Sequence, residues 1–128
     1  MALQIIGGIG NITIVPPNQD RASVRAFDTG PGVCVIDGVV RRLYPEKLYD
    51  VDGELALRGT VIAGIVNELL DERCFTAPPP KSTGRELFTP SYIDAFINKC
   101  RATSPTATNE DIIATAVELT AASIALAF

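Results

Sequence analysis

Residues 3–15 read LQIIGGIGNITIV, and this stretch decides the fold. Its two apolar parts, residues 3–6 and 11–15, predict two strands, and the glycines between them predict a tight turn. A proline-rich loop follows, and residues 23–27 predict a third short strand. The sequence therefore predicts an antiparallel meander whose first turn is rich in glycine.

Helices are predicted after the strands. Apolar residues recur at helical spacing in residues 33–43, in residues 61–73 and near the C-terminus, and a proline in the first turn starts a short helix at residues 90–100. Thr108, with an acidic residue three positions later, predicts the cap of the last helix. The segment 44–59 is rich in Asp and Gly and predicts a loop. The fold class is therefore α/β, an antiparallel strand meander followed by helices.

Composition limits the functions that are open to the chain. It has 128 residues with 11 basic and 15 acidic side chains, a net charge of -4, and no basic run longer than Arg41-Arg42, so no nucleic-acid partner is expected. It has no histidine, which excludes Ser-His-Asp and Cys-His catalysis and histidine-ligated metals. Any acid–base chemistry must come from carboxylates, and no metal site is predicted.

The setting and the ends of the chain can also be predicted. No apolar stretch has membrane-spanning length, and three cysteines far apart in sequence favour a reducing compartment, so we expect a cytoplasmic protein without a membrane partner. A strand pattern begins just after Met1, and the last helical pattern runs to Phe128 without a stop signal. We therefore expect residues 1–128 to form a single incomplete domain.

Asp28 is the main candidate for catalysis. An apolar strand leads into this residue, and a glycine-bounded turn is predicted to follow it. Partial burial combined with the dipoles of the turn would suit a general base. The alternative is an Asx-turn, in which the carboxylate only caps the next backbone N–H groups. Asp37, farther along on the predicted helix, is expected to be a solvated or capping residue.

The triplet Asp28-Thr29-Gly30 also allows an aspartic protease interpretation. In such enzymes two chains dimerise and two carboxylates share one proton. That architecture is almost all strand, whereas the segments after residue 32 predict helices. The protease remains the weaker enzyme alternative.

Three further segments carry weaker signals. The turn Gly7-Gly8-Ile9-Gly10-Asn11 offers backbone N–H groups that side chains do not shield, which suits a phosphate but equally a plain hairpin. The loop with Lys81, Ser82 and Arg85 places cations and hydroxyls together, which suits a hydroxylated or anionic ligand but equally a surface loop. Residues 49–54 resemble a calcium loop superficially, without the full ligand series.

The order of the motifs is more distinctive than any single one. The motifs are IGGIGNIT at residues 6–13, FDTGPG at 27–32, ID at 36–37, YDVDG at 49–53, PPKSTGRE at 79–86 and VELTA at 117–121. In this order they resemble the anhydro-N-acetylmuramic acid kinase family, including its fungal relatives, the levoglucosan kinases. The resemblance covers the whole chain but only a middle section of the family. It implies an actin-like ATPase and sugar kinase fold of the ribonuclease H-like type, with this chain as the start of the C-terminal lobe.

The resemblance also implies roles for single residues. Asp28 matches the family's catalytic base, which activates a water to attack the anomeric carbon of a 1,6-anhydro sugar. The resemblance implies that the released 6-oxygen then takes the γ-phosphoryl group of ATP in the presence of Mg²⁺. The phosphate-binding turn corresponds to Gly7, Gly8, Gly10 and Asn11. The residues assigned to the sugar are Thr29, Gly30, Lys81, Ser82 and Arg85. The implied partners are the anhydro sugar and ATP, and a homodimer is allowed.

Departures from the family pattern bear on activity. Val33 and Ile5 stand where the family usually has Asn, which removes hydrogen-bonding groups near the site. The N-terminal phosphate motif and the C-terminal glycine-rich nucleotide motif of the family are absent from these residues. We therefore expect this chain to be inactive as a kinase by itself, and a non-catalytic remnant or binding module is the alternative function.

Overall fold

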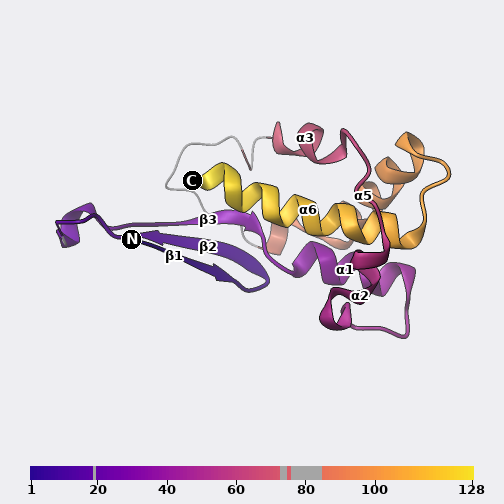
Figure 1. Ribbon diagram of the computed structural model, residues 1–128, viewed down its shortest axis with the longest axis horizontal. Helices are drawn as coiled ribbons and strands as arrows, with labels where there is room; N and C mark the ends of the chain where they lie inside the picture. The colour runs from indigo at the N-terminus through magenta and orange to yellow at the C-terminus, as the bar shows by residue number, and fades with distance from the viewer. Residues whose placement is uncertain (19, 73–74, 76–84) are drawn as a thin grey trace.

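A three-stranded sheet forms one end of the molecule and helices form the other (Figure 1). The structure is a computed structural model that describes residues 1–18, 20–72, 75 and 85–128. The strands are β1 (Ala2–Ile6), β2 (Ile9–Ile14) and β3 (Arg25–Pro31), paired antiparallel in the order β1-β2-β3. The predicted α/β class and the strand meander are confirmed.

Two strands, β2 and β3, differ from the prediction by more than one residue at a boundary. Strand β2 already begins at Ile9, so the turn outside the strands consists of Gly7 and Gly8 alone. Strand β3 was predicted over residues 23–27 but continues to Pro31, and a 3-10 turn (η1, Arg21–Ser23) precedes it. Asp28 therefore lies inside a strand and not in a turn after it, because pairing with β2 outweighs the low strand propensity of Asp, Gly and Pro.

Three predicted helices are present, and two predictions for the middle of the chain are wrong. The helices are α1 (Cys34–Leu43), α5 (Pro90–Thr103) and α6 (Asn109–Ala127). The helix predicted over residues 61–73 is reduced to α3 (Ile65–Leu70), because Gly64 has a φ of 88°, which a continuous helix excludes. The segment 44–59 is not all loop: it contains the 3-10 turn η2 (Val51–Gly53) and α2 (Glu54–Arg58). A further 3-10 turn, η3, spans Arg85–Leu87.

Helix α6 joins the sheet to the other helices (Figure 1). Its buried side chains pack with those of α1, α3 and α5 in one core, whose fully buried members include Val35, Val39, Phe96, Ile112, Ile113 and Leu119. In the second half of α6, the Thr120 hydroxyl donates a hydrogen bond to the Gly32 carbonyl at 2.7 Å. The sheet is thereby fixed to the helical core.

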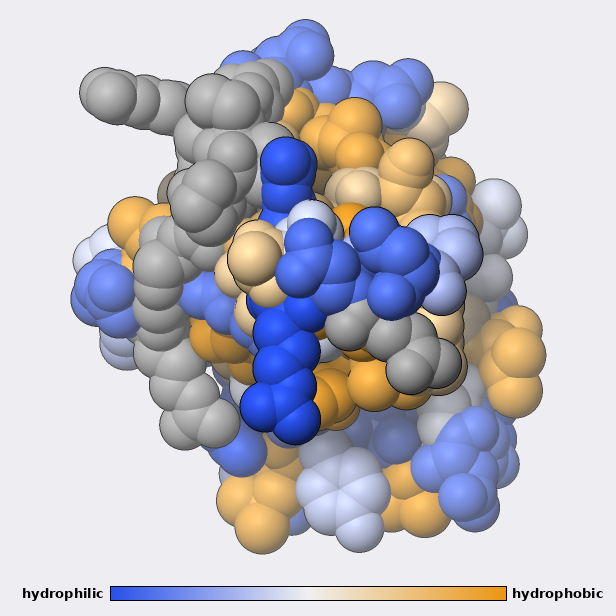
Figure 2. Space-filling model, turned by 90° about the vertical axis from the view of Figure 1, so that its left-hand side faces the viewer, coloured by the Kyte–Doolittle hydropathy of each residue, from blue (hydrophilic) through white to orange (hydrophobic). Residues whose placement is uncertain are grey.

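The sheet has one covered face and one open face. Ile12 and Phe27 lie opposite each other on the covered face and are 0% and 5% exposed. Leu3 and Ile5 of β1 lie on the open face and are 52% and 64% exposed. Figure 2 views this end of the molecule, where hydrophobic side chains remain at the surface among hydrophilic ones. The two faces of the sheet thus differ in exposure.

The helical content decides one alternative from the sequence. In the ranges that the structure describes, strand structure is confined to β1, β2 and β3, and helices make up most of the rest. The nearly all-β architecture that an aspartic protease requires is therefore not found there. Among those same residues, none of the helices combines the length and the apolar character needed to cross a lipid bilayer.

Candidate functional site

Asp28 is half-buried on the open face of the sheet, directly opposite Asn11 of β2. Nδ2 of Asn11 donates a hydrogen bond to Oδ1 of Asp28 at 3.1 Å. The register shifts beside this pair: Gly10 pairs with Gly30, so Thr29 is an extra residue on β3 and forms a β-bulge. The structure thus joins two residues that the sequence assigned to different roles, the base and the phosphate turn.

The Gly7-Gly8 turn lies against the first turn of α1. The backbone N–H groups of Gly32 and Cys34 donate to the Gly8 carbonyl at 2.9 and 3.1 Å, and the N–H of Val33 donates to the Gly7 carbonyl at 2.8 Å. Val33 is the N-cap residue of α1, and its side chain makes no capping hydrogen bond. The carbonyls of the hairpin therefore accept hydrogen bonds from the residue before the N-cap, from the N-cap residue and from the first helical residue of α1, Cys34.

This contact also orients the turn. A trans peptide directs its C=O and its N–H to opposite sides. The Gly7 carbonyl points at α1, so the N–H of Gly8, which belongs to the same peptide, points away from the helix. An outward N–H at a turn without side chains is an arrangement that can bind an anion.

Close contacts explain two of the glycines. A Cβ at Gly32 would lie 2.0 Å from the Gly7 carbonyl oxygen, and a Cβ at Gly10 would lie 2.5 Å from Oγ1 of Thr29. At Gly7 the nearest atom of the described residues to such a Cβ, the Ile9 carbonyl oxygen, is 3.7 Å away. Gly32 is therefore needed for the hairpin–helix contact and Gly10 for the bulge, whereas none of the described residues crowds Gly7 in this way.

The residues predicted to contact the sugar fall into two groups. Thr29 is 1% exposed, and its Oγ1 has no hydrogen-bond partner among the described residues; a Cβ at Gly30 would meet the Phe75 ring at 2.9 Å. Both therefore lie within the bulge and its packing. Lys81 and Ser82 lie outside the described residues, and Arg85 is described only as the first residue of η3. A role for these residues toward a sugar stays a prediction.

A cavity of about 410 Å³ opens beside the hairpin, between α1 and the start of α5. Its lining includes Gly8, Val33 and Asp37, and a second cavity of about 310 Å³ shares Val33 and Asp37 with it. Burial raises the pKa of the half-buried Asp37 carboxyl above its ordinary value of 3.8, and the Arg41 guanidinium acts in the opposite direction. The sequence predicted a solvated or capping Asp37, because helical spacing shows the face of α1 but not the cavities that border it.

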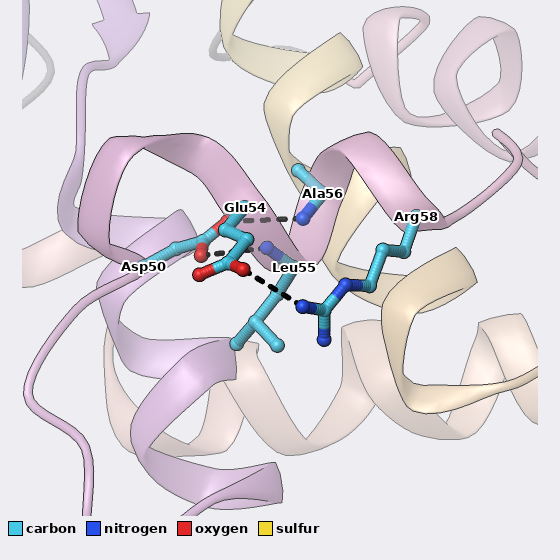
Figure 3. A network of polar contacts seen from close by, with 5 residues as sticks. All are labelled: Asp50, Glu54, Leu55, Ala56 and Arg58. Carbon is cyan, nitrogen blue, oxygen red and sulfur yellow. Dashed lines mark hydrogen bonds and ion pairs between the residues drawn. The ribbon is translucent and has the colours of Figure 1, made fainter.

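The Asp-rich segment 49–54 forms a helix cap (Figure 3). The Asp50 carboxylate accepts hydrogen bonds from the N–H groups of Leu55 and Ala56 at 2.9 and 3.0 Å, and Glu54 pairs with Arg58 at 2.8 Å. In the described part of the chain, no three His, Cys, Asp or Glu side chains gather as a metal site requires. The likeness of this segment to a calcium loop therefore reflects the cap of α2.

Comparison with known proteins gives consistent matches. A family model described as anhydro-N-acetylmuramic acid kinase matches residues 1–128. Proteins with this name are similar to the chain: that of Caldanaerobacter subterraneus subsp. tengcongensis is 46% identical over 97% of this chain and 31% of its own length. The protein of Clostridioides difficile is 44% identical over 97% of this chain and 31% of its own length. That of Burkholderia cenocepacia is 50% identical over 94% of this chain and 30% of its own length. The chain thus spans about a third of the length of these curated relatives.

Proposed function

The chain belongs to the anhydro-N-acetylmuramic acid kinase family, and from this premise we propose that it carries the catalytic base of an ATP-dependent sugar kinase. The substrate is a 1,6-anhydro sugar, either anhydro-N-acetylmuramic acid or levoglucosan. The chain forms the start of the C-terminal lobe in an actin-like fold, and the enzyme requires the remaining two thirds of a full-length relative for activity.

The proposed reaction begins at Asp28. Its carboxylate takes a proton from a water, whose oxygen forms a bond to the anomeric carbon while the bond from that carbon to O6 breaks. O6 then takes the γ-phosphoryl group of ATP, which leaves ADP and the 6-phosphorylated sugar. The observation that carries the proposal is the position of Asp28: half-buried, on the open face of the sheet, with a donor on one carboxylate oxygen.

The phosphate groups of ATP are assigned to the hairpin end, formed by Gly7, Gly8, Gly10 and Asn11. The outward N–H of Gly8 supports this assignment, and none of the described residues crowds Gly7. Mg²⁺ accompanies ATP in the proposal, but the described residues do not gather a ligand set for it, so we derive no step through the ion. The remaining expected contacts to the sugar come from Thr29, Gly30, Lys81, Ser82 and Arg85. ATP places the reaction in the cytoplasm, and a homodimer stays a prediction.

A chimera tests the proposal. Residues 1–128 replace the matching segment of the full-length Caldanaerobacter relative, to which the chain is 46% identical. ATP-dependent phosphorylation is measured with both anhydro sugars, for the chimera and for its Asp28→Asn variant. We expect the variant to lose at least about 10³-fold in kcat, because the water then lacks its base, while ADP binding is retained. Turnover in the variant close to that of the chimera would refute the assignment of Asp28.

The same experiment separates the alternative function. Ile5 pairs with Asn11 in the sheet and places an aliphatic side chain beside the proposed site. If the chimera binds ADP but phosphorylates neither sugar, even after Ile5→Asn and Val33→Asn, the chain is a non-catalytic binding module. Activity of the unmodified chimera excludes that alternative.

A further inference from the structure

We propose that Asn11 is a positioning residue for Asp28: it fixes the carboxylate through the hydrogen bond from Nδ2 to Oδ1 at 3.1 Å. This inference rests on the proposed function of Asp28 and assigns the Asn11 side chain a role apart from phosphate binding. An ionised carboxylate only accepts hydrogen bonds, and the Asn amide nitrogen only donates, so the pair is complementary.

The sheet register makes the contact specific. Asn11 and Asp28 are direct cross-strand partners, and the side chains of such partners lie close enough for short polar groups to touch. The pair exists because Thr29 is the extra residue of the bulge; without the bulge, the pairing of Gly10 with Gly30 would place Thr29 opposite Asn11. Gly10 permits the bulge, since a Cβ there would lie 2.5 Å from Oγ1 of Thr29.

The other neighbour of Asn11 favours the same contact. Ile5 is the cross-strand partner of Asn11 on β1, and its side chain offers no hydrogen-bonding atom. Ile5, Asn11 and Asp28 form a row across the three strands. The Asp28 carboxylate is therefore the polar side chain beside the Asn11 amide in this row. A donor on one oxygen restricts the rotation of the carboxylate, and a general base requires a fixed orientation toward the water it activates.

The test uses the chimera defined above with three variants. Asn11→Ala removes the donor, Asn11→Asp keeps the shape but places a second carboxylate beside the first, and Thr13→Ala is the control. Thr13 lies two residues along the same strand and face and pairs with Ala26. For each variant, kcat, KM for ATP and the pH dependence of kcat are measured.

For Asn11→Ala we expect kcat to fall about 10- to 100-fold, because a misplaced base loses its alignment, with KM for ATP changed less than about twofold. For Asn11→Asp we expect the acidic limb of the pH profile to move upward by about one unit, because like charges disfavour ionisation. The control should match the unmodified chimera. A kcat of Asn11→Ala equal to that of the control overturns the inference, and so does a rise in KM for ATP at unchanged kcat.

A second measurement separates this inference from the proposed function. The χ1 rotamer of the Asp28 side chain is measured by NMR from its three-bond couplings in the 128-residue chain and in its Asn11→Ala and Thr13→Ala variants. A single rotamer in the chain and in Thr13→Ala that becomes averaged in Asn11→Ala supports the contact even if Asp28→Asn retains turnover and the proposed function fails. Couplings unchanged in Asn11→Ala overturn the positioning role, whatever the chimera catalyses.

Discussion

Gly32→Ala is expected to lower the free energy of unfolding by about 3 kcal/mol. The new Cβ would lie 2.0 Å from the Gly7 carbonyl oxygen and 3.0 Å from the Gly7 carbonyl carbon. Both are backbone atoms, so the hairpin end must move away from α1. The movement breaks the hydrogen bonds from Gly32, Val33 and Cys34 to the hairpin, and each of these contributes about 1 kcal/mol net.

The effect is large enough to measure in two ways. With an m-value of about 2 kcal/mol/M for urea, the unfolding midpoint falls by about 1.5 M. With an unfolding entropy of about 2.1 cal/mol/K per residue, Tm falls by about 11 °C. The urea midpoint and Tm are recorded by circular dichroism for the 128-residue chain and for its Gly32→Ala variant.

Gly7→Ala is the matched control, because it adds the same methyl group on the other side of the same contact. Among the described residues, the Cβ at Gly7 approaches no atom closer than 3.7 Å, so the free energy of unfolding should change by less than about 0.5 kcal/mol. If Gly32→Ala is no less stable than Gly7→Ala, the hairpin does not hold the start of α1, and the reasoning is refuted.

Two further predictions concern the start of α6. Thr108→Ala removes a capping box in which Oγ1 of Thr108 accepts a hydrogen bond from the Asp111 N–H at 3.1 Å. The free energy of unfolding, measured by urea titration, should fall by about 1 kcal/mol. Thr106→Ala, at an exposed neighbouring position, is the control, and an equal loss in this variant would contradict the prediction. The N–H groups of Thr108 and Thr60 lower the pKa of Asp111 below its ordinary value of 3.8. A lowered folded-state pKa means that the carboxylate contributes its full stability above pH 3.8 and loses it as the pH falls through the folded-state pKa. The stability difference between the chain and Asp111→Asn should therefore shrink below pH 3.8 in acid unfolding curves, and a difference independent of pH would show that the charge of Asp111 does not matter.

Local signals predicted the elements that local chemistry determines. The hairpin followed from apolar runs around two glycines, the start of α6 from Thr108 and an acidic residue three positions later, and the start of α5 from Pro90. These elements carry their signals within a few residues. The core-facing side of α1 followed from apolar spacing for the same reason.

The remaining features depend on contacts between distant segments. The end of β3 could not be predicted, because Asp28-Thr29-Gly30-Pro31 has the composition of a turn and becomes a strand only by pairing with β2. Helix α2 was missed, because its cap, Asp50, lies in a segment whose composition is typical of loops. Among the site residues, Asp28 was predicted from the apolar strand that leads into it and from the family resemblance, but its contact with Asn11 requires a register that includes the bulge, which no local pattern contains.

The way α1 begins has a consequence for the order of folding events. The N–H groups at its start bond to Gly7 and Gly8, which lie far upstream in the sequence, and the N-cap residue Val33 supplies no acceptor of its own. A helix of 10 residues is too short to persist alone in water, so a peptide with the sequence of α1 should be mostly unstructured. We therefore expect the hairpin to form first and α1 to grow from its carbonyls. A strand turn would then serve as the nucleus for a helix.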